Sequence, residues 1–296
     1  MKKYYNSLEN RVFDVVTTIL VVFILIICIL PLLNVLALSF SGKQAAISGQ
    51  VSLLPVDFTL DSYKYLLQEE RFFQSFFVSV KRVIFGVTLN MILTVLMAYP
   101  LSLETNRFPS RNRYMWLLIF TMLFNGGVVP WYFVIKNVGL LDKLGALILP
   151  GAVPVFNVIL IINFFRNVPK AIKESAELDG ITPVGMLVYI MIPLAKPAIA
   201  TVALFCIVNH WNSFFDGMLL INTPEKQPLQ TYIQALVIRI SDITQSGMSV
   251  DQIADRMSQR TFNAAKIVAS TIPILVIYPF LQRYFVSGIT LGSVKE

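Results

Sequence analysis

The sequence predicts an all-α membrane protein with six transmembrane helices. Of the 296 residues, 56% are hydrophobic and 14% are charged, and the mean hydropathy is +0.69. That balance is too apolar for a soluble fold with a solvated surface. A helix needs about 20 predominantly apolar residues to cross a hydrocarbon core. Six runs of the sequence, about 15–38, 77–103, 114–136, 144–165, 197–221 and 264–286, meet this requirement.

The first run also has features of a signal peptide. Basic residues precede it, and Ala37-Leu38-Ser39 loosely fits a cleavage site. Its apolar stretch is well beyond the roughly 7 to 15 residues of a typical signal segment. We therefore predict an uncleaved anchor that begins one membrane domain covering residues 1–296.

The connections between the spans predict the orientation of the chain. With the N-terminus inside, the inner segments carry more Lys and Arg than the outer ones, and cytoplasmic connections hold this excess. Both termini and the segment 166–196 are therefore predicted to be cytoplasmic, with outer loops at 41–74 and 223–262. The net charge of +7 then indicates attraction to anionic lipid rather than to nucleic acid.

The second span carries Lys81 and Arg82 near its outer end. Long basic side chains at such a position reach the headgroups by snorkelling, without a further function. Alternatively, Arg82 faces a water-filled translocation path and attracts an anionic substrate.

The third span is interrupted by Asn125-Gly126-Gly127, and Pro130 follows within one turn. The triplet lies roughly 17 Å into the helix at 1.5 Å per residue, near mid-membrane. Broken backbone at that depth needs protein or a water-filled cavity around it, and in transporters it often marks the binding region. These three residues are candidates for the translocation path. The alternative is that they form the outer end of a tilted helix.

The fifth span contains His210, Trp211 and Asn212 toward its outer half, followed by Asp216. Ring stacking and amide hydrogen bonds are used in sugar recognition, so the first three residues are further candidates for the translocation path. A belt of interfacial aromatic residues also explains Trp211.

The chain lacks the motifs of catalysis, of nucleotide binding and of metal binding. His210 is the single histidine, so a pair of histidines cannot hold a metal ion, and no serine or cysteine lies near it in a nucleophile context. Neither GxxxxGK[ST] nor GxGxxG occurs, so we expect no bound nucleotide. Cys28 and Cys206 lie inside predicted spans and indicate no disulfide framework. We expect no catalytic residue and no metal ligand.

The sequence KESAELDGITPVGMLVYIMIP, residues 173–193, lies between the fourth and fifth spans. With the preceding NVPKAI, residues 167–172, its first part predicts a helix with i,i+4 pairs of Lys170 with Glu174 and of Lys173 with Glu177. The opposite face is small and shallowly apolar, with Ala171, Ile172, Ser175, Ala176 and Leu178. Such a face fits the groove of a partner protein. The alternative is an interfacial helix that rests on lipid.

Two residue pairs predict a sharp turn in this segment. Asp179-Gly180 ends the first helix, because glycine accepts the left-handed conformation of a C-terminal turn. Thr182-Pro183 starts the next helix, as N-cap and first helical residue.

This segment resembles the EAA motif of the permease subunits of type I ABC importers: EAA, three residues, Gly, nine residues, Ile, any residue, Leu, Pro. The matching residues, at the same spacing, are Glu174, Ser175, Ala176, Gly180, Ile190, Ile192 and Pro193. Ser175 for Ala and Ile192 for Leu are conservative exchanges, and Asp179-Gly180 is typical of the carbohydrate branch. The stretches FNGGVVPWYFVIKNVGLLD, QPLQTYIQALV and YPFLQRYFVSGITLGSVKE extend the resemblance to the oligosaccharide branch over about residues 10–296.

The resemblance implies the type I ABC importer permease fold and a function in sugar import. The implied partners are a second, similar permease, two cytoplasmic ATPase subunits that bind ATP and Mg, and an extracellular solute-binding protein. The chain itself would hold no cofactor and catalyse no reaction. The helix before Gly180 would be the coupling helix, seated in a cleft of the ATPase, with Glu174 as its anchor.

The resemblance also implies a location in the cell membrane, and its branch suggests a Gram-positive bacterium. Lys81 and Arg82 favour acidic substrates such as uronate-containing oligosaccharides. Two alternatives remain open from the sequence: an importer of the same fold for a non-sugar solute, and a stand-alone membrane enzyme or scaffold.

Overall fold

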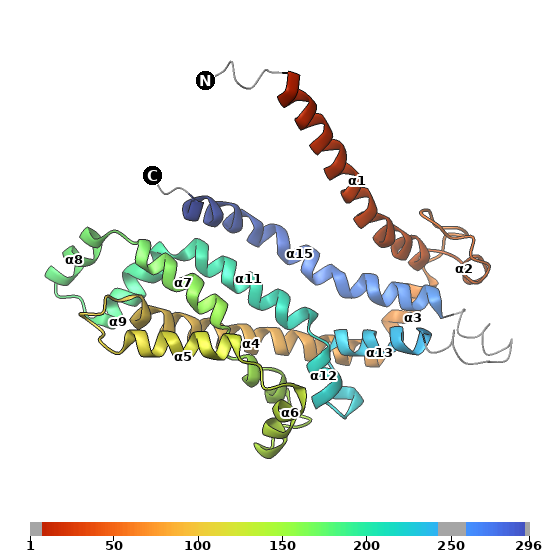
Figure 1. The fold of residues 1–296 in the computed structure, drawn as a ribbon. Coiled ribbons are helices and arrows are strands. Elements are labelled where there is room, and N and C mark those ends of the chain that lie inside the picture. Colours follow the sequence, from red (N-terminus) through yellow and green to blue (C-terminus); the bar gives the residue numbers. More distant parts are fainter. Residues whose placement is uncertain (1–7, 242–258, 294–296) are drawn as a thin grey trace. The chain divides into compact units, whose positions relative to one another are not determined.

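The computed structural model describes residues 8–241 and 259–293, and every regular element in these residues is helical (Figure 1). The elements are α1 (Leu8–Ser39), α2 (Lys43–Ile47), α3 (Asp61–Gln68), α4 (Glu70–Ser102), α5 (Arg111–Leu123), α6 (Val128–Asn137), η2 (Leu144–Leu147), η3 (Leu149–Gly151), α7 (Val155–Asn167), α8 (Lys170–Leu178), α9 (Pro183–Gly185), η4 (Met186–Met191), α10 (Ile192–Leu194), α11 (Lys196–Asn212), α12 (Phe215–Leu220), η5 (Pro224–Lys226), α13 (Leu229–Ser241) and α15 (Arg260–Ser293). The predicted all-α class is confirmed over these residues.

Three helices are long and apolar enough to cross a membrane: α1, α4 and the first part of α15. Three further candidates are pairs of helical segments that bend at a short break. The bends are 113° between α5 and α6, 47° between η2–η3 and α7, and 82° between the stretch α9–α10 and α11. The described residues therefore hold up to six spans, the predicted number, if each bent pair crosses once.

Two of the breaks differ from the spans expected from the sequence. The run 144–165 begins with 3-10 turns and bends before Val155, and the run 197–221 stops at Asn212 and resumes at Phe215. The first break contains Pro150 and Pro154, and a proline lacks the N–H and the space that a continuous helix needs. The expected interruption at Asn125-Gly126-Gly127 is present, between α5 and α6.

The described residues form two compact units. Unit 1 consists of the chain before Arg71 together with residues 235–271, and unit 2 consists of residues 71–234 and those after 271. In unit 1, α2 and α3 lie in the predicted outer loop 41–74, and the Lys266 ammonium forms a buried ion pair with Glu69 at 2.7 Å. The predicted outer loop 223–262 includes η5, all of α13 and the first residues of α15, and its residues 242–258 lie outside the described part.

In unit 2, the helices α4, α5, α7 and α11 run side by side (Figure 1). Their core consists of fully buried apolar side chains, including Ala98, Val158, Phe165 and Val202. Between membrane helices such a core stabilises through close packing, because lipid is as apolar as the side chains. Helices α8 and α9 lie at one end of this bundle, and α6 and α12 lie at the opposite end (Figure 1).

Candidate functional site

Helix α4 carries a buried stripe along one face, made of the polar residues Ser75, Ser79, Arg82, Asn90 and Thr94 together with Gly86. Successive members are three or four residues apart, so they share one side of a helix with 3.6 residues per turn. Polar groups inside a membrane span are costly unless they face the protein interior and find partners there. This stripe contacts the breaks of two of the predicted spans.

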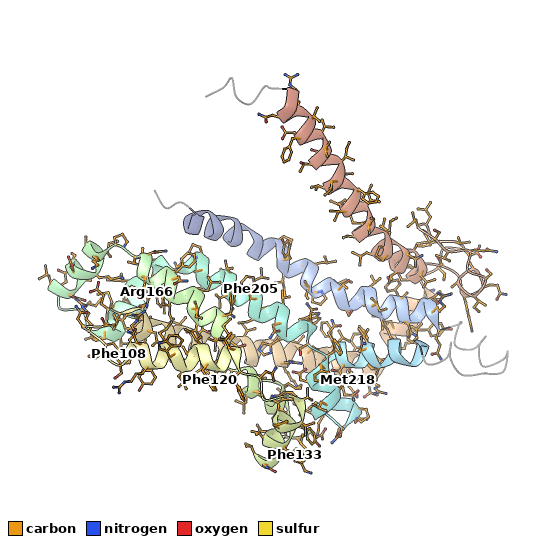
Figure 2. The ribbon with its side chains drawn as sticks, viewed as in Figure 1. Phe108, Phe120, Phe133, Arg166, Phe205 and Met218 are labelled. Carbon is orange, nitrogen blue, oxygen red and sulfur yellow. The ribbon has the colours of Figure 1, made fainter. Side chains whose placement is uncertain are left out.

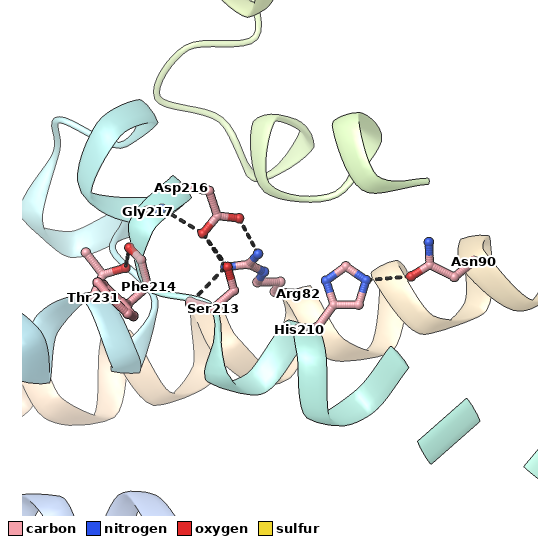
Figure 3. Close-up of polar contacts among 8 residues, drawn as sticks. All are labelled: Arg82, Asn90, His210, Ser213, Phe214, Asp216, Gly217 and Thr231. Carbon is pink, nitrogen blue, oxygen red and sulfur yellow. Dashed lines mark hydrogen bonds and ion pairs between the residues drawn. The ribbon is translucent and has the colours of Figure 1, made fainter. Parts of the chain in front are cut away.

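Arg82 lies at the centre of the stripe and forms an ion pair with Asp216 of α12 (Figure 3). Its Nη1 donates to Asp216 Oδ1 at 3.1 Å and to the Ser213 carbonyl oxygen at 3.3 Å, and its Nη2 donates to Asp216 Oδ2. The Arg82 side chain is 3% exposed and that of Asp216 is 17% exposed. The snorkelling alternative is therefore wrong for Arg82, because the Asp216 carboxylate binds its guanidinium inside the protein.

Asp216 also accepts hydrogen bonds from groups other than Arg82. Its Oδ1 also accepts hydrogen bonds from the Ser213 hydroxyl at 2.8 Å and from the Gly217 backbone N–H at 2.9 Å (Figure 3). In this conformation the charge of Arg82 is neutralised within the chain. An anionic substrate would meet the free guanidinium only after α12 moved.

The polar stripe supplies hydrogen bonds to the breaks of other helices. Ser213 lies between α11 and α12, and its carbonyl oxygen accepts the hydrogen bond from Arg82. Asn90 Nδ2 donates to the carbonyl oxygens of Gly151 and Ala152, at 2.8 and 2.9 Å, in the break before α7. Broken backbone at membrane depth must be satisfied by protein or water, and α4 meets that requirement for two spans.

His210 belongs to the same network. It is buried, and its Nε2 lies 2.7 Å from Asn90 Oδ1 (Figure 3). Its ring fills the space above Gly86, where an added Cβ would lie 2.5 Å from Nε2. Gly86 thus allows α4 and α11 to approach closely enough for this hydrogen bond.

Replacing Gly86 with alanine is expected to lower the thermal stability of the purified protein, because the new methyl group overlaps the imidazole ring. Overpacking of this kind typically costs about 1–3 kcal/mol. In a His210→Ala background, where the ring is absent, the same Gly86→Ala change should cost much less. Thermal unfolding of the four proteins in detergent measures the difference, and equal costs in both backgrounds would contradict the packing argument.

The structure places the other candidates of the fifth span in different surroundings. Trp211 is buried and packs edge-on against Phe76, with ring centroids 5.8 Å apart, so its ring serves packing in this conformation. Asn212 is exposed and lines a hollow of about 340 Å³. Asn209, Phe214 and Phe215 share this hollow, which offers amide groups and aromatic rings to a ligand.

Asn125, Gly126 and Gly127 are exposed in the single chain. The Asn125 side-chain oxygen accepts the backbone N–H of Gly127 at 2.9 Å, which closes a tight turn between α5 and α6. Their place in a translocation path stays a prediction.

The predicted turn of the EAA segment is present. Helix α8 ends at Leu178, and Gly180 has a φ of 75°, the left-handed conformation that favours glycine. The N–H of Ile181 bonds to Ala176 O, and that of Gly180 bonds to Glu177 O, the pattern of a Schellman motif. The Thr182 hydroxyl then caps the next helix by accepting the Gly185 N–H at 3.1 Å.

The charged face of α8 does not form the expected pairs within the helix. Lys170 pairs instead with Glu104, and Glu177 pairs with Arg107, both in the loop that joins α4 to α5. Lys173 Nζ donates to the Phe165 carbonyl oxygen at 2.9 Å. An exposed i,i+4 pair contributes only a few tenths of a kcal/mol, so the local pairs do not prevent these contacts with neighbouring segments.

The remaining EAA residues fall on two sides of the segment. Ala176 is buried and Ile190 is partly buried, and both pack in the core of unit 2. The exposed residues are Glu174, Ser175, Asp179, Gly180 and Pro193. Leu178 is 90% exposed, so the end of α8 presents an uncovered apolar side chain.

Three features of the site were not predicted from the sequence: Asn90, the pairing of Arg82, and Ser79, whose hydroxyl accepts the Leu229 N–H at 2.8 Å. The i,i+4 spacing of small polar residues in an apolar span was the available signal for Asn90 and Ser79. Among the residues that the structure describes, no group of three or more His, Cys, Asp or Glu is placed to hold a metal ion.

Comparison with known proteins gives one family for most of the chain. Residues 75–291 match the family described as binding-protein-dependent transport system inner membrane component. The polygalacturonan/rhamnogalacturonan transport system permease protein YtcP of Bacillus subtilis is 39% identical, over 97% of this chain and 100% of its own length. Protein LplC of the same organism is 41% identical, over 98% of this chain and 97% of its own length.

A solved structure agrees with these relatives. A chain from the crystal structure of a bacterial ABC transporter involved in the import of the acidic polysaccharide alginate superposes with a TM-score of 0.84. It is 31% identical, and the match covers 94% of this chain and 98% of that chain.

Proposed function

The chain belongs to the family of binding-protein-dependent transport system inner membrane components, and we propose that it is the permease subunit of an ATP-driven importer of acidic oligosaccharides. The family and the type I importer fold that the EAA segment suggested are thereby confirmed. As a member of this family, the chain is a multi-pass membrane protein. Its Bacillus relatives support, as a proposal, a Gram-positive source.

The proposed substrate class rests on two similarities that cover nearly the whole chain and that agree on an acidic polysaccharide. One relative is a polygalacturonan/rhamnogalacturonan transport system permease, and the matching structure is that of a transporter involved in the import of the acidic polysaccharide alginate. Polymers of uronic acids carry a carboxylate on each such ring. The hollow beside Asn209, Asn212 and Phe215 supports a sugar substrate, because amides bind hydroxyl groups and aromatic rings stack on sugar faces.

The proposed importer contains a second permease, two ATPase subunits that bind ATP and Mg, and an extracellular solute-binding protein. In it, α8 is the coupling helix and lies in the cytoplasm. Closure of the ATPases moves α8, and the permease changes between inward-open and outward-open states. Such coupling requires that the ATPases contact the two states differently.

Reconstitution of the chain with these partners in proteoliposomes tests the proposal. Trigalacturonate is expected to stimulate ATP hydrolysis at least tenfold more than a neutral trisaccharide, and omission of the binding protein should abolish the stimulation. Equal stimulation by the neutral sugar would remove the acidic specificity. Stimulation by a peptide alone would favour the non-sugar alternative, and activity without any ATPase partner would favour a stand-alone enzyme.

A further inference from the structure

Helix α8 is bound to the loop that joins α4 to α5 by two ion pairs of opposite polarity. Lys170 Nζ lies 2.7 Å from Glu104 Oε1, and the Arg107 guanidinium binds both carboxylate oxygens of Glu177, with Nη2 to Oε2 at 2.8 Å. The helix supplies the cation of the first pair and the anion of the second. The two pairs therefore fix both the position and the direction of α8 on the loop.

The charges specify one register of α8. Lys170 and Glu177 are seven residues apart, which is two turns or about 10 Å along one face of a helix. A shift of one turn in one direction would bring Glu174 opposite Glu104. A shift in the other direction would bring Lys173 opposite Arg107. Like charges repel in both cases, so α8 and the loop are held in their present alignment.

The loop is closed by a turn of its own, and hydrogen bonds join the ends of α4, α5 and α7 beside it. The Arg107 N–H donates to the Glu104 carbonyl oxygen at 3.1 Å, which closes a turn. The Leu101 carbonyl oxygen, in the last turn of α4, accepts from Arg111 of α5 at 2.9 Å and from Arg166 of α7 at 3.3 Å. Figure 2 shows Arg166 at the end of the bundle that carries α8. Displacement of the loop would therefore displace α4 and α5.

The contact between α8 and the loop is largely electrostatic. The two segments border a hollow of about 550 Å³, which Glu104, Arg107, Lys170 and Glu177 all line. Hydrogen bonds from Lys170 lower the pKa of Glu104 from its usual value, and hydrogen bonds from Arg107 lower the pKa of Glu177. Both carboxylates are therefore ionised at neutral pH and available for pairing.

We propose that Glu104 and Arg107 are positioning residues that transmit the displacement of α8 to α4 and α5. The inference rests on the proposed function, in which an ATPase moves α8. Helix α4 extends from this loop to Arg82, which holds Asp216 in α12, so a displacement of α4 reaches the break between α11 and α12. Exposed ion pairs contribute little to folding stability, and the effect of breaking them should appear in coupling.

Charge reversal with rescue tests the proposal in the reconstituted transporter. Arg107→Glu is expected to reduce substrate-stimulated ATP hydrolysis about fivefold or more, while the ATPase subunits still co-purify with the permease. Arg107→Glu combined with Glu177→Arg re-forms the pair with reversed polarity and should restore at least half of the stimulation. Lys64→Glu breaks the exposed pair with Asp61 in unit 1 and serves as the matched control, with no expected change.

The outcomes separate the two proposals. Wild-type protein without sugar-stimulated hydrolysis would contradict the proposed function. Thermal unfolding of the purified chain would then test the ion pair itself. The wild type, Arg107→Glu, Glu177→Arg and the double variant form a double-mutant cycle, and their unfolding free energies should show a favourable interaction between the two residues. With an active wild type, full activity of Arg107→Glu, or a double variant no better than the worse single variant, would overturn the transmission role.

Discussion

Replacing Arg82 with glutamine is expected to destabilise unit 2 strongly, because Asp216 is left as a mostly buried carboxylate without its guanidinium partner. Breaking a buried ion pair on one side costs roughly 3–5 kcal/mol. The Asp216 side chain is 17% exposed, so partial solvation places the expected cost near the lower limit, about 3 kcal/mol. The Ser213 carbonyl loses a donor as well, and this adds to the cost. Thermal unfolding in detergent measures the effect.

Two matched variants identify the cause. Lys81→Gln removes the same charge from the neighbouring residue, whose side chain is exposed, and should leave the unfolding temperature nearly unchanged. Arg82→Gln combined with Asp216→Asn replaces both ions with amides, and should recover most of the lost stability because no buried charge remains unpaired. A double variant as unstable as Arg82→Gln alone would contradict the ion-pair argument.

The double variant also tests the role of Arg82 in transport. If it folds but responds to trigalacturonate no more than to a neutral trisaccharide, Arg82 contributes to the selection of acidic substrates. If the preference for trigalacturonate persists, the pair acts only in holding α12 against α4. The single variant cannot make this distinction, since a misfolded permease would respond to neither sugar.

The features that the sequence predicted correctly depend on neighbouring residues. An apolar run of about 20 residues predicts a span by its length alone. The turn after α8 follows from Gly180, which adopts the left-handed conformation, and from Thr182, which caps the next helix within three residues. Each of these interactions is completed by groups close together in the chain, so composition and spacing were sufficient.

The features that the sequence did not predict depend on residues that lie far apart along the chain. Arg82 and Asp216 are 134 positions apart, and Arg107 and Glu177 are 70 positions apart. The spacing within α8 predicted pairs along the helix, but Lys170 and Glu177 pair with residues of the loop. The break between α11 and α12 has no proline between Asn212 and Phe215. It is satisfied by Arg82 from another helix, which no local pattern encodes.

Replacing Leu178 with aspartate is expected to prevent stable association with the ATPase while leaving the permease folded. Leu178 is 90% exposed at the end of α8, whereas the charged side of α8 is occupied by the loop between α4 and α5. We therefore expect the partner to contact the side of α8 that does not face the loop, where Leu178 is the most exposed apolar side chain of the helix. Loss of a central apolar anchor costs about 2 kcal/mol or more, which is roughly a 30-fold loss of affinity.

Co-purification of the ATPase with the detergent-solubilised permease measures this loss. Leu54→Asp is the matched control, because Leu54 is 77% exposed in the predicted outer loop, and its replacement should leave the association intact. Both variants should unfold at the wild-type temperature, since neither side chain is buried. Normal ATPase association of Leu178→Asp would favour the alternative that α8 rests on lipid, because an apolar residue inserted into the membrane surface would not contribute to the protein–protein contact.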